Sequence, residues 1–197
     1  MKNKEIQAIL NGEAVIFPTD TVYGLGAIPK HDAIKNLYKI KNRDENKKII
    51  ALVSSVDKIK EITDEINYNV VSKFMPGPLT IVCKSNNKFK DLVGETIGIR
   101  IPNNKFALQL INSVGGILMT TSANISGEKS PVDFADIPTE LLSKVCCYFK
   151  ANQTLSGIPS TIVSYLNGKY TLLREGQIKF EDILKIGGID IENDKSK

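Results

Sequence analysis

The sequence predicts a single α/β domain with a twisted, mixed parallel and antiparallel sheet flanked by helices. Short apolar runs, typical of buried strands, alternate with helical patterns early in the chain. Later, Asn167-Gly168 separates two apolar runs, and this dipeptide is a strong indicator of a β-hairpin. The 197 residues are 42% hydrophobic and 24% charged, as in ordinary globular proteins, and they contain no internal repeat or linker. We therefore expect one sheet with an antiparallel portion and an open, concave site at its strand ends.

The first elements follow from the spacing of apolar residues near the N-terminus. Ile6, Ile9 and Leu10 lie at helical spacing and predict a short amphipathic helix. Residues 14–17 form an apolar run that predicts a buried strand. This strand should end at Pro18, because proline cannot donate a hydrogen bond to a neighbouring strand.

A polar cluster and two glycines follow this strand. Gly24 and Gly26 are expected to form a turn in which positive φ angles let the backbone approach a ligand. In open α/β folds, ligands bind at such strand ends. An ordinary strand-to-helix loop, with threonine and aspartate as turn residues, explains the same stretch equally well.

The next elements are expected to continue the alternation. A helix capped by Asp32 should end in the cationic segment 39–43. Residues 49–53 predict a second buried strand, and Ser55 should cap the helix that follows it.

The remaining elements follow from the same apolar patterns. Further strands are expected at residues 79–83, 97–101, 117–120, 146–149, 161–165 and 170–174. Further helices are expected at residues 66–74, 106–111, 138–145 and 180–186. The expected domain spans residues 1–187, and a polar tail covers residues 188–197.

The composition excludes several classes of protein. Three cysteines and one histidine, with no CxxC motif, make a structural zinc site improbable. The odd cysteine count and the absence of a signal peptide or long apolar segment indicate a cytoplasmic protein without a membrane span. The net charge of +4 permits an anionic ligand or RNA without requiring either. The chain has no Walker motif and no GxSxG nucleophile elbow, so neither a P-loop nor a serine hydrolase is indicated.

Lys39, Lys41 and Arg43 form the first candidate cluster. As a structural feature, they place favourable charge at a helix C-terminus. As a functional feature, they form a clamp for a polyphosphate, in which arginine gives forked hydrogen bonds and lysine a point charge.

Arg100 lies inside an otherwise apolar strand. Burying an unpaired guanidinium costs several kcal/mol or so, so this side chain requires an anion. An aspartate or glutamate of the chain and a substrate carboxylate are the two candidates. We expect Gly98 to leave room above the sheet and Arg100 to reach into it.

Polar residues also gather at the ends of two other expected strands. The segment 120–127 contains four hydroxyl groups and an asparagine amide, and the segment 157–161 repeats this theme before a strand. Arg174 ends the second strand of the expected hairpin. Serine and threonine caps explain part of this pattern, but the supply of donors exceeds what a plain loop needs.

Six segments, taken in order, resemble the successive motifs of the YrdC-type threonylcarbamoyl-AMP synthases. They are Pro18–Gly26, Lys41-x-Arg43, Pro76–Thr80, Ile99–Pro102, Ser122–Gly127 and Ser160–Val163. Each motif is weak alone, but together they extend from Phe17 to Arg174. The resemblance departs from the family pattern where Asp44 and Lys48 replace prolines, and where Arg174-Glu175-Gly176 stands for Arg-Pro-Gly.

The resemblance implies a role for each matched residue. Lys41 and Arg43 would be catalytic. The ATP-binding residues would be Lys39, Lys41, Arg43, Thr96, Ser122, Asn124 and Arg174. The L-threonine-binding residues would be Thr21, Arg100, Thr120, Ser122 and Ser160. No protein-bound metal is implied.

The resemblance also implies an activity. The family joins L-threonine, bicarbonate or CO2 and ATP into threonylcarbamoyl-AMP and pyrophosphate, with Mg2+ accompanying ATP. A tRNA-modifying threonylcarbamoyl transferase complex then uses the product, and this chain resembles the short, single-domain type. The alternative is an RNA-binding module that uses the same basic concave face, which also leaves room for weak RNA binding by the enzyme. Arg100 within an apolar strand and the lack of interleaved aromatic residues disfavour this alternative.

Overall fold

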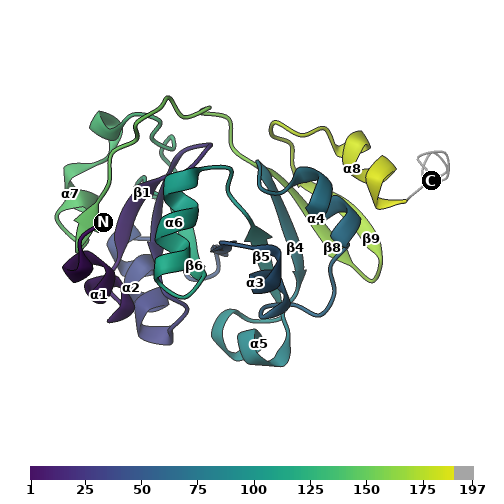
Figure 1. The fold of residues 1–197 in the computed structure, drawn as a ribbon, viewed down its shortest axis with the longest axis horizontal. Helices are drawn as coiled ribbons and strands as arrows, with labels where there is room; N and C mark the ends of the chain where they lie inside the picture. Colours follow the sequence, from purple (N-terminus) through teal and green to yellow (C-terminus); the bar gives the residue numbers. More distant parts are fainter. Residues whose placement is uncertain (189–197) are drawn as a thin grey trace.

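The computed structural model describes residues 1–188, and a nine-stranded mixed sheet forms its centre (Figure 1). The strands are β1 (Val15–Pro18), β2 (Tyr23–Ala27), β3 (Ile50–Val53), β4 (Leu79–Lys84), β5 (Thr96–Arg100), β6 (Ile117–Ser122), β7 (Cys147–Tyr148), β8 (Thr161–Leu166) and β9 (Lys169–Arg174). Their order in the sheet is β7-β1-β2-β6-β3-β5-β4-β8-β9. The pairs β1–β7, β3–β5 and β4–β8 are parallel, and the other five pairs are antiparallel. The expected mixed sheet is confirmed.

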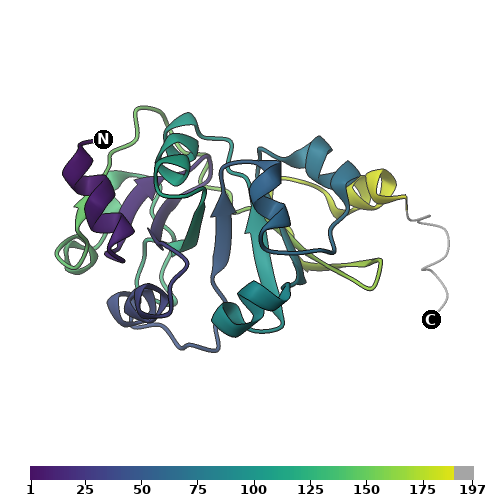
Figure 2. The same ribbon diagram turned by 60° about the horizontal axis from the view of Figure 1, so that its bottom comes forward.

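Helices lie on both sides of this sheet. They are α1 (Asn3–Leu10), α2 (His31–Lys41), α3 (Val56–Lys60), α4 (Tyr68–Phe74), α5 (Asn87–Val93), α6 (Lys105–Ser113), α7 (Thr139–Leu142) and α8 (Phe180–Gly187), with a short 3-10 helix at Phe134–Asp136. In Figure 2, α6 and α4 lie along the upper side of the sheet, and α2 and α5 along the lower side. No helix within residues 1–188 is long and apolar enough to cross a membrane.

The two glycines after the first strand correct one sequence prediction. Gly24 and Gly26 do not form a turn with positive φ; they lie in β2, which pairs antiparallel with β1. The chain reverses earlier, at residues 19–22, and Pro18 is still paired, opposite Tyr23. Glycine is needed here for space, because a Cβ on Gly26 would lie 3.0 Å from the Phe17 ring and 3.2 Å from Thr120 Oγ1.

Helix boundaries differ in detail from the prediction. Lys30, not Asp32, occupies the N-cap of α2, and Asp32 lies in the first turn. Ser55 occupies the N-cap position of α3 without a side-chain hydrogen bond. Helix α5 was not predicted, because only Phe89 of its seven residues is buried and the apolar periodicity is weak. Its start is nevertheless defined by Asn86, whose side chain accepts a hydrogen bond from Phe89 N.

The C-terminal hairpin confirms its sequence signal. Asn167 and Gly168 adopt φ angles of 53° and 75°, the left-handed conformation that a tight two-residue hairpin turn requires. Helix α8 follows, and Gly188 caps its C-terminal end in a left-handed conformation. The rest of the expected polar tail, residues 189–197, lies outside the described residues.

Candidate active site

The register of the central strands brings small and polar residues onto one face of the sheet. Ile50 of β3 lies between Thr120 of β6 and Gly98 of β5, and Gly24 of β2 lies opposite Ser122. Because side chains alternate across a strand, these neighbours point to the same side. A Cβ on Gly98 would lie 2.8 Å from Ile50 Cγ2, so the Ile50 side chain, which lines the cavity, fills the room that was expected above Gly98.

A cavity of about 260 Å³ lies over this face of the sheet. Its wall is formed by Thr19, Thr21, Val22, Tyr23, Gly24, Arg43, Lys48, Ile49, Ile50, Leu52, Thr80, Arg100, Thr120, Thr121, Ser122, Ser130, Pro159, Ser160, Ile162 and Arg174. Four of these described residues are cationic and none is acidic, so the wall favours an anionic ligand. The cavity extends over the sheet face as well as along the strand ends.

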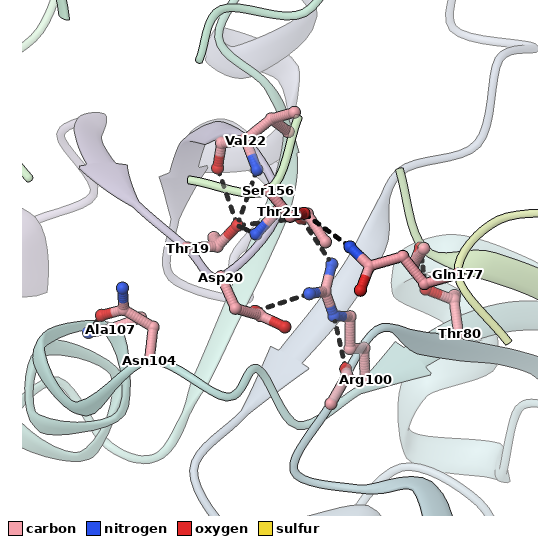
Figure 3. Close-up of polar contacts among 12 residues, drawn as sticks. Thr19, Asp20, Thr21, Val22, Thr80, Arg100, Asn104, Ala107, Ser156 and Gln177 are labelled. Atoms are coloured by element: carbon pink, nitrogen blue, oxygen red, sulfur yellow. Dashed lines mark hydrogen bonds and ion pairs between the residues drawn. The ribbon is translucent and has the colours of Figure 1, made fainter. Parts of the chain in front are cut away.

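Arg100 lies at one side of this cavity, and its guanidinium forms hydrogen bonds with three other residues (Figure 3). Its Nε donates to Gly77 O at 3.0 Å, one terminal nitrogen donates to Thr21 Oγ1 at 3.0 Å, and the other donates to Asp20 Oδ1 at 2.6 Å. The residue is 4% exposed. Burial lowers the pKa of Arg100, and Asp20 opposes this effect.

The ion pair with Asp20 answers one question that the sequence left open. The sequence left two candidates for the anion, an acidic residue of the chain and a substrate carboxylate, and the structure shows an acidic residue in contact with Arg100. The aspartate of the preceding turn, 80 residues away in the sequence, supplies the anion. The guanidinium has five N–H groups and residues 1–188 occupy three of them, so it retains donors for a ligand.

The turn that carries Thr21 is stabilised by its own hydroxyl groups. Thr19 Oγ1 accepts hydrogen bonds from Thr21 N at 3.1 Å and Val22 N at 3.2 Å, and it donates to Val22 O at 2.7 Å. Thr19 Oγ1 also lies 3.0 Å from Thr21 Oγ1. These contacts hold the Thr21 hydroxyl between Arg100 and the cavity.

A second hydroxyl group is fixed on the opposite wall. Ser160 Oγ lies 2.9 Å from Thr80 Oγ1, and Arg174 donates to Ser160 O at 2.8 Å and to Ser160 Oγ at 3.3 Å. Burial and the nearby charge of Arg100 lower the pKa of Arg174. The two arginines therefore reinforce the positive potential at this end of the cavity.

Lys41 lies behind the other end of the wall. Its Nζ donates to Thr121 Oγ1 at 3.1 Å, to Ser122 O and Oγ at 2.5 and 3.0 Å, and to Asn124 Oδ1 at 3.0 Å. Lys41 is only 1% exposed, and neither it nor Asn124 contributes to the cavity wall. Burial, with smaller effects of Arg43 and Lys47, lowers the pKa of Lys41 from 10.5 to about 7. In this conformation Lys41 orients Ser122 rather than facing a ligand itself.

The two other members of the cationic segment differ in position. Arg43 faces the cavity, and its guanidinium donates to Lys47 O at 3.1 Å and Lys48 O at 2.9 Å. Lys39 is exposed on α2 and does not contribute to the cavity wall.

A second cavity, of about 500 Å³, adjoins the first. Lys48 and Ile49 contribute to both walls, and Thr96 lies in the wall of the second cavity only. Helix α2 contributes Ile34 and Tyr38 to this second wall. Thr96 and Arg100 are four residues apart in β5 and therefore share one face of the strand.

Most of the site residues selected from the sequence line one cavity in the structure. Asp20, Thr19 and Thr80 were not selected from the sequence. Asp20 lies in the same motif as Thr21, which was selected as a site residue. Because a buried Arg100 requires an anion, Asp20 could have been identified as its partner. Thr80 follows Pro78 at the start of β4 and faces Ser160 only because β4 and β8 are paired. No sequence signal gives that pairing.

These features define a class: an α/β protein whose sheet face forms a cationic, hydroxyl-lined cavity for an anionic small molecule. A family model that covers Sua5, YciO and YrdC proteins, described as "Telomere recombination", matches residues 7–176. The chain belongs to the Sua5/YciO/YrdC family.

Individual relatives agree with this assignment. The putative threonylcarbamoyl-AMP synthase of Methanocaldococcus jannaschii is 36% identical over 90% of this chain and 86% of that protein. The threonylcarbamoyl-AMP synthase of Pyrococcus abyssi is 33% identical over 91% of this chain, but over only 55% of its own length. This chain therefore spans about half the length of the P. abyssi protein.

Solved structures support the same fold. The crystal structure of P. abyssi Sua5 complexed with L-threonine aligns with a TM-score of 0.83 and 30% identity, covering 92% of this chain and 55% of that chain. Escherichia coli YciO aligns with a TM-score of 0.81 over 93% of this chain and 91% of that chain. At 20% identity, the likeness to YciO concerns the fold alone.

Proposed function

We propose that this chain is an L-threonylcarbamoyladenylate synthase, which forms threonylcarbamoyl-AMP and pyrophosphate from L-threonine, bicarbonate or CO2, and ATP. One observation carries the proposal: Arg100 at one end and Arg43 and Ser122 at the other share a single cavity without acidic wall residues. Such a cavity suits two anionic substrates held end to end. The names of the M. jannaschii and P. abyssi relatives support the same activity.

The end of the cavity around Arg100 is the proposed threonine site. An arginine with free N–H groups binds a carboxylate with defined geometry. Thr21, Thr120 and Ser160 place hydroxyl groups around it and would contact the rest of the amino acid. The P. abyssi Sua5 structure contains L-threonine, which supports this choice of substrate.

The other end is the proposed ATP site. Arg43 and the Ser122 hydroxyl face the cavity at this end and would contact the phosphates, while Lys41 and Asn124 hold Ser122 in place. Arg174 would contact the nucleotide from the Arg100 side of the cavity. The nucleoside would extend past Ile49 into the larger second cavity, where Thr96 lies. Lys39 would contact ATP only if the ligand extended beyond the present walls.

Mg2+ would enter as part of the ATP complex. Among residues 1–188, no three acidic, histidine or cysteine side chains are grouped to hold a metal. The cavity offers hydroxyl oxygens instead, and Mg2+ commonly keeps its waters and binds through substrate phosphates. The ion would supply charge neutralisation at the phosphates.

The chemistry requires positioning more than a nucleophilic side chain. The threonine amine and bicarbonate give a carbamate and water, and a carbamate oxygen then displaces pyrophosphate from the α-phosphate of ATP. Arg100 would hold the carboxylate so that the amine points toward the nucleotide. Arg43 would stabilise the charge that develops on the phosphates, which is the dominant contribution in phosphoryl chemistry.

The product would be consumed by a tRNA-modifying threonylcarbamoyl transferase complex, the proposed functional partner. The cytoplasm, where such a partner would meet it, agrees with three free cysteines in the described chain. RNA binding by the concave face remains the weaker alternative, because the basic residues surround a cavity of small-molecule size.

The test is a reaction of the purified full chain with ATP, L-threonine and 14C-bicarbonate. We expect pyrophosphate release that requires both threonine and bicarbonate, with the label in an adduct of AMP. Omitting either compound is the control. Pyrophosphate release that does not depend on threonine, or tight binding of oligoribonucleotides without turnover of ATP, would contradict the proposal.

A further inference from the structure

Asp20 places a negative charge against Arg100, although it does not itself line the cavity, whose charged wall residues are all cationic. Its Oδ1 accepts a hydrogen bond from Arg100 at 2.6 Å, and its side chain is 15% exposed. Its second oxygen, Oδ2, accepts no hydrogen bond from residues 1–188, and Figure 3 shows it beside the Arg100 guanidinium. One carboxylate oxygen therefore holds Arg100 while the other is free.

The backbone fixes this carboxylate in place. Asp20 O accepts a hydrogen bond from Ser156 N at 3.2 Å, and Thr21 O accepts one from Gly157 N at 2.9 Å. Gln177 in turn donates to Ser156 Oγ. The turn is thus stabilised by hydrogen bonds of Thr19 within it and by backbone hydrogen bonds from the segment before β8. These contacts restrict movement of Asp20 away from Arg100.

The pair changes what Arg100 can bind. The charges of Arg100 and Asp20 cancel, so the pair attracts a simple carboxylate less strongly than an isolated arginine would. A ligand carboxylate on the remaining Arg100 N–H groups would lie within about 6 Å of the Asp20 carboxylate, since both would be hydrogen-bonded to one guanidinium. Two like charges at this spacing repel each other in a site of reduced dielectric constant.

A zwitterion avoids this repulsion. The ammonium group of an α-amino acid lies next to its own carboxylate, so it would enter the field of Asp20 as the carboxylate meets Arg100. We propose that Asp20 is a specificity-determining residue that makes the Arg100 end of the cavity select zwitterionic amino acids over carboxylates without an amine. This inference rests on the proposed function in one respect, the assignment of Arg100 to the substrate carboxylate.

The test compares L-threonine with 3-hydroxybutyrate, which has the same carboxylate, hydroxyl and methyl groups but no amine. Their dissociation constants are measured by calorimetry or competition on the wild type and on Asp20→Asn. We expect the preference for threonine to fall about tenfold in Asp20→Asn, because 3-hydroxybutyrate gains affinity and threonine loses it. A ratio is insensitive to the fraction of folded protein, so a merely structural role of Asp20 would leave it unchanged.

Two variants serve as controls. Asp20→Glu retains the charge and should retain most of the preference. Asp91→Asn removes one negative charge from an exposed position of α5 and should leave the preference unchanged. An unchanged ratio in Asp20→Asn, or an equal loss of preference in Asp91→Asn, would overturn the inference.

A measurement on the wild type covers the case in which Asp20→Asn does not fold. L-Threoninol carries the ammonium group without the carboxylate, and butane-1,3-diol lacks both. We expect threoninol to bind at least about tenfold more tightly, and equal binding would overturn the inference. Failure of the proposed function is a separate result: it shows as missing threonine-dependent pyrophosphate release, whereas the inference concerns binding ratios alone.

Discussion

The buried Lys41 ammonium group forms no hydrogen bond to a carboxylate within residues 1–188. Its four acceptors, on Thr121, Ser122 and Asn124, are neutral oxygens. Hydrogen bonds stabilise the charged form, but loss of hydration opposes them and dominates. The folded protein therefore pays a free-energy cost for this charge, and ATP phosphates near Ser122 would reduce it.

This cost gives a pH dependence of stability with a definite sign. In the unfolded chain the pKa of lysine stays near 10.5, whereas in the folded protein the pKa of Lys41 is about 7. Between these values the unfolded chain binds more protons, so the free energy of unfolding rises with pH; below about pH 7 the cost is present in full. We expect the wild type to gain stability relative to Lys41→Met between pH 6 and pH 9. Denaturant unfolding of both proteins at several pH values measures this difference, and parallel pH profiles would contradict it.

For single residues, the sequence predicts that a charged side chain requires a partner, but not which residue that partner is. The buried position of Arg100 and its need for an anion follow from one strand pattern. Its partner Asp20 lies in a different motif, and only the fold brings the two together. The same holds for Lys41, whose cationic character predicts a ligand-facing clamp while the fold places it behind Ser122.

Among the elements, β2 and β5 show why glycines occur in the centre of this sheet. Glycine weakens a strand interior, so its presence there usually marks a close approach. Gly24 and Gly26 make room for Phe17 and Thr120, and Gly98 makes room for Ile50. Sequence reasoning identified β5 and its sidedness correctly, but assigned the first two glycines to a turn. A Gly-x-Gly pair is compatible with both structures, and the pairing of β2 with β6 decides between them.

Substitution of Gly98 by alanine tests this close approach. The added Cβ would lie 2.8 Å from Ile50 Cγ2 and 3.2 Å from Thr80 Cγ2, so the Ile50 side chain or the strands must shift. Overpacking of this kind costs about 1–3 kcal/mol of the free energy of unfolding. The matched control is the double variant with Ile50→Ala, which removes the nearest methyl group. Denaturant unfolding should show that the double variant loses less than the sum of the single variants; strict additivity would contradict a direct contact.

For the whole molecule, the sheet order explains how distant motifs form one cavity. The motifs of β2, β6, β3, β5, β4 and β8 are scattered through the sequence but lie next to each other in the sheet. Apolar runs and the Asn167-Gly168 turn predict the class of fold and most elements. They do not predict strand order, because that depends on pairings between segments far apart in sequence. The family resemblance, and not the local sequence patterns, indicated which distant residues belong to one site.

In the proposed function, the cavity has a threonine end at Arg100 and a nucleotide end at Arg43 and Ser122. Arg100→Lys tests it most directly, because lysine can keep the charge and the pairing with Asp20 but loses the bonds to Gly77 and Thr21. Separate titrations with L-threonine and with ATP measure the two ends, and the melting temperature reports on the fold. We predict that threonine affinity falls by about 1–3 kcal/mol, while ATP affinity measured without threonine changes far less. Unchanged threonine affinity, or an equal loss for both ligands, would contradict the division of the site.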